Sequence, residues 1–245
     1  MSIRIMKETK MERRSEKGSG SSEIRSAIEG LSETVKVKPV AEEVKVEVHG
    51  DHTHDDDAHY IPIKPFLSIC NSVLQVLDRI GPTMAVLRQD VYQNIQRLET
   101  LHESDPSVFS NLVEIVKKEV NEGTARKGSS CSKAIVWLTR SLDFTVALLQ
   151  KLARDPGQSV EKAVEESYNT TLKPWHRWIS SAAFRQIALK LVPDNETFIG
   201  LLMAKDENYE TLKEDMQTLI LLLVPFLEEI HSVLRFYSLD RIKAT

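Results

Sequence analysis

The sequence of 245 residues has little cysteine, few aromatic residues and no long apolar run. Its two cysteines, Cys70 and Cys131, are too few for a disulfide framework in a chain of this length, so we expect both to be reduced. The longest apolar run, residues 219–227, is much shorter than the ~20 residues that a membrane-spanning helix needs. The first residues lack the apolar core of a signal peptide. Together these absences predict a soluble, cytoplasmic protein.

Strong positive charge is also missing. The net charge is -4 and the pI about 6.0, which gives no reason to expect a nucleic-acid partner. There is no Gly-rich phosphate loop, HExxH pattern or nucleophile motif, so we expect neither an enzyme nor a cofactor. With 41% hydrophobic residues, the chain can bury one sizeable core or two small ones. We expect a monomer.

Residues 1–58 differ from the rest because they contain no aromatic residue and are rich in Lys, Glu and Ser. Such a segment offers too little apolar surface to offset the entropy lost on ordering. We therefore predict a disordered charged tail over residues 1–58 and one folded domain over residues 59–245. Residues 35–48 partly alternate Val with charged residues, but a single strand would have no partner there.

The end of this tail resembles a metal-binding tract, since residues 49–59 read HGDHTHDDDAH. Imidazole and carboxylate groups are suitable metal ligands. Nothing in the surrounding sequence would hold them in a fixed geometry, however. We predict a solvated, weakly chelating tract and no metal site.

From residue 61 onward the apolar residues recur with a helical period. Pro, Gly and capping residues divide this part into successive helices, and the expected caps include Asp105, Ser159, and Asp194 or Asn195. The expected helices cover approximately residues 65–80, 84–101, 106–120, 132–154, 159–173, 175–191, 195–203 and 208 onward. Pro225 should kink the last of them. The predicted class is all-α, with amphipathic helices packed in layers around one core.

The helix over residues 84–101 carries a polar stripe. Asp90, Asn94 and Arg97 lie at i, i+4 and i+7 and therefore share one face. Their carboxylate, amide and guanidinium groups together accept and donate hydrogen bonds, as a ligand rich in hydroxyl groups requires. The alternative is a solvated helix face with a surface Asp/Arg pair.

Three local patterns occur in order: residues 90–98 read DVYQNIQRL, residues 131–140 read CSKAIVWLTR, and residues 172–178 read LKPWHRW. In combination, from about residue 60 to the C-terminus, they resemble the glycolipid transfer protein family. The resemblance implies a two-layer all-α sandwich of about eight helices. It also implies a surface headgroup site that leads into an apolar tunnel, and transfer of one sphingolipid between membranes without chemistry.

The resemblance assigns roles to five residues. Asp90 and Asn94 match positions that bind sugar hydroxyls, and Asp90 also matches the acceptor of the ceramide amide N–H. Arg97 stands where the family usually has Lys, so its role is less defined. Trp137 matches the ring on which the first sugar lies, and His176 matches the donor to the ceramide carbonyl. For Trp137 and His176 the alternative is a structural role in the core.

Membrane contact and the tunnel are also implied. Trp178 matches a residue at the membrane surface in this family, and Trp175 stands near it, so we expect a shallow, transient docking patch. The tunnel is expected to be lined by residues from the following set: Phe66, Ile69, Val73, Phe109, Leu142, Val146, Phe184, Leu189 and Phe226.

The choice between a sugar and a phosphate headgroup depends on three positions. A second branch of the superfamily carries ceramide-1-phosphate with cationic residues at the places of Asn94, Lys133 and Trp137. Here two of the three are of the sugar-binding type, which favours a glucosylceramide-like ligand. Lys133 either tolerates an anionic group or lies in solvent, and we expect solvent. The alternatives are ceramide-1-phosphate transfer, a lipid sensor that signals through the N-terminal tail, and a helical adaptor.

Overall fold

The computed structural model describes residues 22–37, 60–155, 157–176 and 192–243. Within these ranges the chain forms α-helices and one short 3-10 turn, η1 (Pro82–Met84), and no strand. The helices are α2 (Glu23–Val37), α3 (Ile63–Ile80), α4 (Ala85–Ser104), α5 (Leu112–Asn121), α6 (Cys131–Arg154), α7 (Val160–Thr171), α9 (Asn195–Leu202) and α10 (Tyr209–Phe236). The predicted all-α class is confirmed for the described residues. The expected helix of residues 175–191 lies almost entirely outside them.

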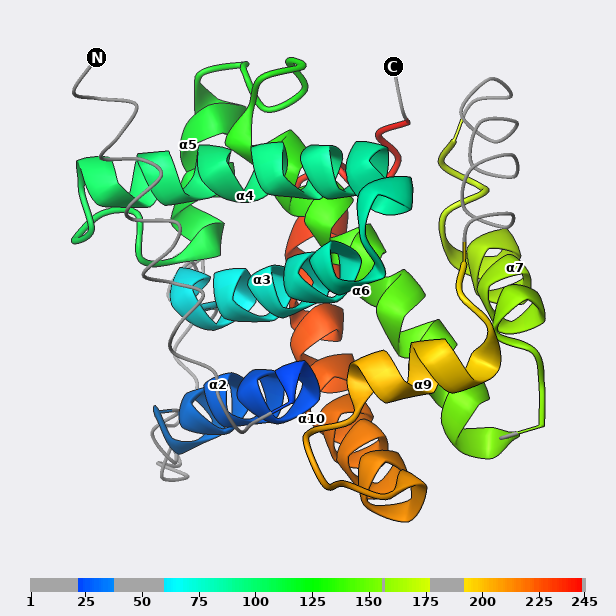
Figure 1. The fold of residues 1–245 in the computed structure, drawn as a ribbon. Coiled ribbons are helices and arrows are strands. Elements are labelled where there is room, and N and C mark those ends of the chain that lie inside the picture. Colours follow the sequence, from blue (N-terminus) through cyan, green and yellow to red (C-terminus); the bar gives the residue numbers. More distant parts are fainter. Residues whose placement is uncertain (1–21, 38–59, 156, 177–191, 244–245) are drawn as a thin grey trace, which may run out of the picture.

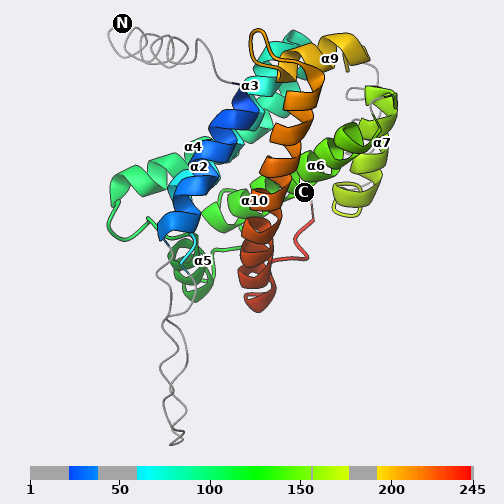
Figure 2. The same ribbon diagram turned by 90° about the horizontal axis from the view of Figure 1, so that it is seen from below.

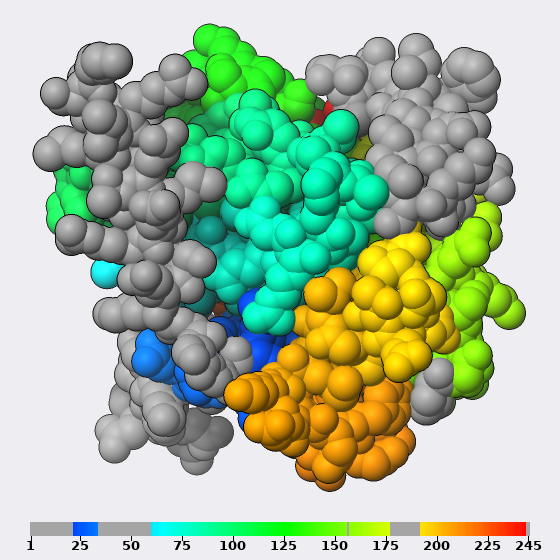
Figure 3. All heavy atoms as spheres, viewed as in Figure 1, coloured from blue at the N-terminus to red at the C-terminus, as the bar shows by residue number. Residues whose placement is uncertain are grey.

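The helices pack in two layers. Figure 1 shows α2, α3 and α4 side by side in front of α6 and α10, and Figure 2 shows α10 crossing α6 with α2 alongside. The contacts between neighbouring helices form a closed ring, in which α2 contacts α3, α3 contacts α4, α4 contacts α6, α6 contacts α10, and α10 contacts α2. Their apolar faces therefore enclose one core. Figure 3 shows α4 at the centre of one face, with α9 and the start of α10 below it.

Helix α2 corrects the expectation of a disordered tail over residues 1–58. Ile24, Ala27 and Leu31 recur at helical spacing and are all buried, with Leu31 only 1% exposed. They pack against α3 and α10. Small aliphatic residues on one stripe suffice for burial because the rest of the domain supplies the opposing surface. The remaining tail residues, including the histidine tract, lie outside the described residues.

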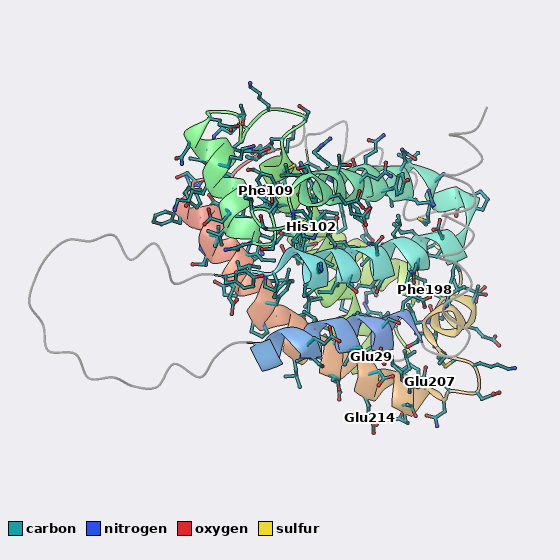
Figure 4. All side chains as sticks on the ribbon, turned by 90° about the vertical axis from the view of Figure 1, so that its left-hand side faces the viewer. Glu29, His102, Phe109, Phe198, Glu207 and Glu214 are labelled. Carbon is teal, nitrogen blue, oxygen red and sulfur yellow. The ribbon has the colours of Figure 1, made fainter. Side chains whose placement is uncertain are left out.

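Ion pairs hold α2 in place. Arg25 Nη2 lies 2.5 Å from Glu207 Oε1, and Arg25 Nε lies 2.6 Å from Asp215 Oδ2. At the start of α2, Glu23 Oε1 pairs with Arg79 Nη2 of α3 at 2.5 Å. Figure 4, in which Glu207 is labelled, shows α2 beside the loop that precedes α10. The partners of Arg25 are more than 180 residues away along the chain, so no local sequence pattern could have predicted these ion pairs.

Several helices begin at a capping residue. The side chains of Ser130, Ser159, Asp194 and Asn208 each accept a hydrogen bond from a backbone N–H in the first turn of their helix. Ser159 and Asp194 are among the caps that the sequence predicts. These bonds satisfy amide groups that have no partner within the helix.

The helix expected from residue 106 begins later, at Leu112. Asp105 does cap a turn, since its carboxylate accepts from the N–H groups of Ser107 and Val108. The chain then becomes extended, because Pro62 and Asn111 form an isolated antiparallel bridge. Asn111 becomes the true cap and accepts from Val113 N. A pairing with residues near 62 thus overrides the local helix signal.

Two further expectations concern α10 and the cysteines. Helix α10 runs from Tyr209 to Phe236 and includes Pro225.

Cys70 and Cys131 are free and buried, at 2% and 8% exposure. Burial raises the pKa of the Cys70 thiol well above its usual range and the pKa of Cys131 to about 11. Both thiols therefore stay protonated at neutral pH.

Candidate lipid-binding site

Helices α4 and α6 run in opposite directions and form the frame of the site. At one end, Arg97 Nη1 lies 3.5 Å from Ser130 O, and Cys131 Sγ lies 3.8 Å from Arg97 O. At the other end, Leu87 of α4 and Phe144 of α6 pack against the same small cluster. Residues near 90 on α4 are therefore level with residues near 137–141 on α6. This arrangement brings together two of the three sequence patterns.

The polar stripe of α4 forms a connected set. Asn94 is buried, and its Nδ2 donates to Asp90 O at 2.9 Å. Asn94 Oδ1 accepts from Arg97 Nη1 at 3.3 Å. Arg97 is half-buried. Together the two hydrogen bonds hold the side-chain amide of Asn94 in one orientation. A buried asparagine in the middle of a stripe is not what a purely solvated helix face would contain.

Asp90 has an exposed side chain, and no described residue donates a hydrogen bond to its carboxylate. Partial removal of water by the surrounding protein raises the pKa of Asp90, and the positive charge of Arg97 offsets part of that rise. As far as the described residues go, the carboxylate thus keeps its capacity to accept hydrogen bonds from a ligand.

Trp137 and His176 lie together, as the motifs predict. Their ring centroids are 5.6 Å apart and their planes differ by 25°. Trp137 is half-buried, so part of its ring stays accessible. His176 Nδ1 lies 3.2 Å from the hydroxyl of Tyr168. When that hydroxyl donates to Nδ1, the proton of the neutral ring is on Nε2, where it can be donated to a carbonyl.

The charge state of His176 follows from its surroundings. Burial lowers the pKa of His176, and the nearby positive charge of Arg140 lowers it further. The ring is therefore neutral at physiological pH. A neutral imidazole offers one donor and one acceptor, which suits an uncharged polar ligand.

Arg140 also lies at this site, although the sequence patterns assign it no role. Its Cζ lies 5.0 Å from the ring centroid of Trp137 and 4.0 Å from that of Trp175. It also donates to Asp240 O at 2.7 Å and to Ile242 O at 2.6 Å. Burial lowers the pKa of Arg140 to about 10, so it remains charged at neutral pH. Arg140 therefore orients both indole rings and ties the C-terminal segment to α6.

The two residues expected to dock on membranes are only partly described. Trp175 is half-buried, with a guanidinium against its ring, so much of its surface serves packing. Trp178 lies outside the described residues. Their membrane role stays a prediction. No helix among the described residues is both long and apolar enough to cross a bilayer.

We expect Lys133 to lie in solvent from the sequence, but this expectation is wrong, because the residue is buried at 7% exposure. The two residues before it, in the first turn of α6, are bonded to α5. Glu119 of α5 accepts from Cys131 N at 2.8 Å and from Ser132 N at 2.7 Å, and so draws α5 over this end of α6. A carboxylate at a helix N-terminus is favourable because of the exposed N–H groups there.

Beside the polar stripe lies an apolar cavity of about 190 Å³. Val91 follows Asp90, and Ser141 is one turn beyond Trp137, and both line the cavity. Polar groups and cavity therefore share the same two helices. The volume is below the roughly 300 Å³ at which ligand pockets usually begin, so the walls must separate to admit two lipid chains.

The lining of this cavity differs from the expected set. Ile69 and Val73 do line it, whereas the following residues are buried elsewhere in the core: Phe66, Leu142, Val146 and Phe226. Phe109 is also outside this wall, since it lies beside His102 at the far end of α4, whereas Phe198 of α9 is in the wall (Figure 4). Phe184 and Leu189 lie outside the described residues.

Helix α2 supplies part of the wall that the sequence interpretation missed, through Ile24, Ala27 and the stem of Glu23. Only the spacing of Ile24, Ala27 and Leu31 could have indicated it. Among the described residues no group of three or more His, Cys, Asp or Glu side chains is placed to hold a metal ion.

Comparison with known proteins agrees with this geometry. Residues 61–204 match the family model described as glycolipid transfer protein. The chain is 59% identical over 184 residues to glycolipid transfer protein 3 of Arabidopsis thaliana, covering 75% of this chain and 78% of that protein. It is 51% identical over 222 residues to glycolipid transfer protein 2 of the same plant, covering 91% and 93%.

Solved structures show the same fold. A structure that describes how FAPP2 selects simple glycosphingolipids with the GLTP fold has a TM-score of 0.68 and 27% identity, covering 77% of this chain and 92% of that one. A mutant of Arabidopsis ACD11 in complex with ceramide-1-phosphate has a TM-score of 0.72 at 16% identity, covering 90% and 98%. The chain belongs to the glycolipid transfer protein family and is a lipid transfer protein with the two-layer all-α fold of that family.

Proposed function

We propose that this lipid transfer protein carries a glycosphingolipid of the glucosylceramide type. The supporting observation is the juxtaposition at one end of the apolar cavity. There the Asp90 carboxylate accepts no hydrogen bond from a described residue, and Asp90 on α4 is level with the half-buried Trp137 on α6. A pyranose ring packs its apolar face on an indole while its edge hydroxyls bond to polar groups. Asn94 and Arg97 extend the polar side of such a site.

The ceramide portion would bind next to this headgroup. Asp90 can accept from the amide N–H, and His176 can donate to the amide carbonyl from its Nε2. The two lipid chains would enter the apolar cavity, where each buried CH₂ is worth roughly 0.8 kcal/mol. No covalent step is needed. We expect the protein to act in the cytosol, as a monomer, with transient contact of Trp178 and Trp175 with membrane surfaces.

A phosphate headgroup is the second candidate, because ACD11 binds ceramide-1-phosphate and shares the fold. Arg97 and Lys133 would attract an anion. The neutral groups at the central positions, Asn94 and Trp137, favour the sugar instead. Neither of them supplies the cationic donors that clasp a phosphate most strongly.

Transfer of fluorescent glucosylceramide and ceramide-1-phosphate between vesicles tests the proposal for the wild type and Asp90→Val. We expect transfer of glucosylceramide that Asp90→Val reduces at least tenfold. Gln93→Val is a matched control, since Gln93 is exposed on the same helix. Preference for ceramide-1-phosphate, or an equal loss with both Val variants, would contradict the sugar assignment.

A further inference from the structure

A buried carboxylate lies in the wall of the apolar cavity. Glu23, the first residue of α2, lines this cavity and is only 8% exposed. Its Oε1 pairs with Arg79 Nη2 at 2.5 Å, but its Oε2 is buried and has no hydrogen-bond partner among the described residues. A buried polar atom without a partner costs free energy, so such an atom is rare unless a bound molecule supplies the missing hydrogen bond.

The other polar side chains that line this cavity have partners within their own helices. The hydroxyl groups of Ser72, Ser141 and Thr145 each donate to the backbone carbonyl one turn earlier, at 3.3, 3.0 and 2.9 Å. Their protons are therefore used, and their neutral oxygen atoms are weaker acceptors than a carboxylate. Among the described lining residues, Glu23 Oε2 is thus the strongest acceptor that lacks a donor.

Glu23 and the polar stripe of α4 lie on opposite sides of α3. Figure 1 shows α3 between α2 and α4, and Arg79, the partner of Glu23, is in the last turn of α3. The same guanidinium group donates to Leu201 O of α9 at 2.8 Å, so the carboxylate lies where α2, α3 and α9 meet. A lipid with its headgroup at Asp90 would therefore bring a hydrocarbon chain, and not its amide group, to Glu23.

We infer that Glu23 determines specificity for the hydrocarbon chain, because its Oε2 accepts a hydrogen bond from a hydroxyl group near the free end of a bound lipid chain. This rests on the part of the proposed function that places lipid chains in the cavity, and not on the choice of sugar. An unsubstituted chain leaves the carboxylate oxygen unpaired, whereas a hydroxylated chain supplies the missing donor. The bond is charge-assisted and shielded from water, which strengthens it.

This selectivity comes from α2. Glu23 lies outside residues 61–204, which match the family model, so the carboxylate is not part of the segment that defines the family. The wall around it is apolar, through residues such as Ile24, Leu77 and Leu202. In that wall one acceptor is enough to distinguish a chain with a hydroxyl group from a chain without one, since no water competes for the bond.

The test measures how well two glucosylceramides displace a fluorescent lipid from the full-length protein. One carries a palmitoyl chain, and the other carries the same chain with a hydroxyl group on its terminal carbon. We expect the wild type to bind the hydroxylated lipid at least as tightly as the plain one. In Glu23→Met, which keeps the side-chain length but removes both oxygen atoms, the affinity for the hydroxylated lipid relative to the plain one should fall at least tenfold, because the hydroxyl group would be buried without a partner.

Arg79→Met is the matched control, since it removes the same ion pair but leaves the Glu23 carboxylate in place. It should keep the relative affinity of the wild type, and the melting temperatures of the two variants show how much stability each has lost. An equal loss of relative affinity in both variants would assign Glu23 a structural role and overturn the inference. A wild type that disfavours the hydroxylated lipid as strongly as Glu23→Met does would also overturn it.

The same two chains on ceramide-1-phosphate separate this inference from the proposed function. If only the ceramide-1-phosphate lipids bind, the sugar assignment fails, and the effect of Glu23→Met on the hydroxylated chain should appear with that headgroup instead. If the glucosylceramides bind but their relative affinity is the same in the wild type and Glu23→Met, the inference alone fails. If neither headgroup is bound, both fail.

Discussion

The apolar cavity and the polar stripe of α4 are adjacent, but they would interact with a lipid through different forces. The cavity offers almost only hydrocarbon surface, so it stabilises any lipid in proportion to the chain length that it buries. The stripe offers directional groups, such as Asn94, whose orientation is fixed by bonds to Asp90 O and Arg97. Under the proposed function, affinity and choice of lipid would therefore be carried by adjacent but separable regions.

The two regions also differ in how widely their residues are spread along the sequence. The polar stripe lies within two turns of one helix, whereas the cavity wall draws on α2, α3, α4, α6, α7, α9 and α10. Changes in the cavity should thus affect stability and every lipid alike. Changes in the stripe should affect the choice between lipids and leave stability almost constant.

Leu31→Ala should have the largest effect on stability, at about 2–5 kcal/mol, because Leu31 is 1% exposed in the part of α2 that packs on the core. Thermal or urea unfolding measures it. Glu29→Ala, on the exposed side of the same helix (Figure 4), should change stability little. Equal effects of the two changes would mean that α2 is not part of the folded core.

Val73→Trp should reduce the transfer of every lipid more than tenfold, since the larger ring fills the apolar cavity, and should cost about 1–3 kcal/mol of stability through overpacking. The ratio of glucosylceramide to ceramide-1-phosphate transfer should not change. Leu221→Trp is the control, because Leu221 is 75% exposed on α10. An altered ratio would show that the cavity also takes part in headgroup selection.

Trp137→Ala should lower glucosylceramide transfer about threefold to tenfold, as expected for loss of about 0.5–1.5 kcal/mol of ring stacking. Trp137→Phe should retain most of the rate, since Phe keeps a flat ring. Vesicle transfer assays with both variants measure this. If Ala and Phe gave the same rate, Trp137 would have a structural role only.

Asp90→Asn should raise stability slightly at neutral pH, while it reduces transfer. Because the folded protein raises the pKa of Asp90, the folded state holds this proton more tightly than the unfolded state. The charged carboxylate therefore lowers the stability of the wild type above its usual pKa. The difference in melting temperature between wild type and variant should vanish below about pH 4. A variant that is less stable at pH 7 would contradict this.

Much of the fold was predictable because its signals are local. Apolar periodicity and caps such as Ser159 and Asp194 defined helices to within a few residues. Where the prediction failed, a distant partner decided the outcome. The bridge between Pro62 and Asn111 delayed α5, and the core surface of α3 and α10 ordered α2.

The site divides in the same way. Asp90, Asn94 and Arg97 could be placed on one face from spacing alone, and the structure brings Trp137 and His176 together as the motifs indicate. The roles of Arg140 and Lys133 could not be predicted. Both depend on tertiary structure: Arg140 bonds to carbonyl groups of the C-terminal segment, about 100 residues away, and Lys133 is buried although it is a charged residue on α6.

The two buried thiols give this protein a practical advantage for spectroscopy. Maleimide reagents attack the exposed thiolate, and neither Cys70 nor Cys131 is exposed or readily ionised. A cysteine introduced at an exposed position such as Val86, which is 65% exposed, would then be labelled alone in the otherwise wild-type chain. A single environment-sensitive dye at that position, near the start of α4, would report lipid entry directly and without labelled lipid.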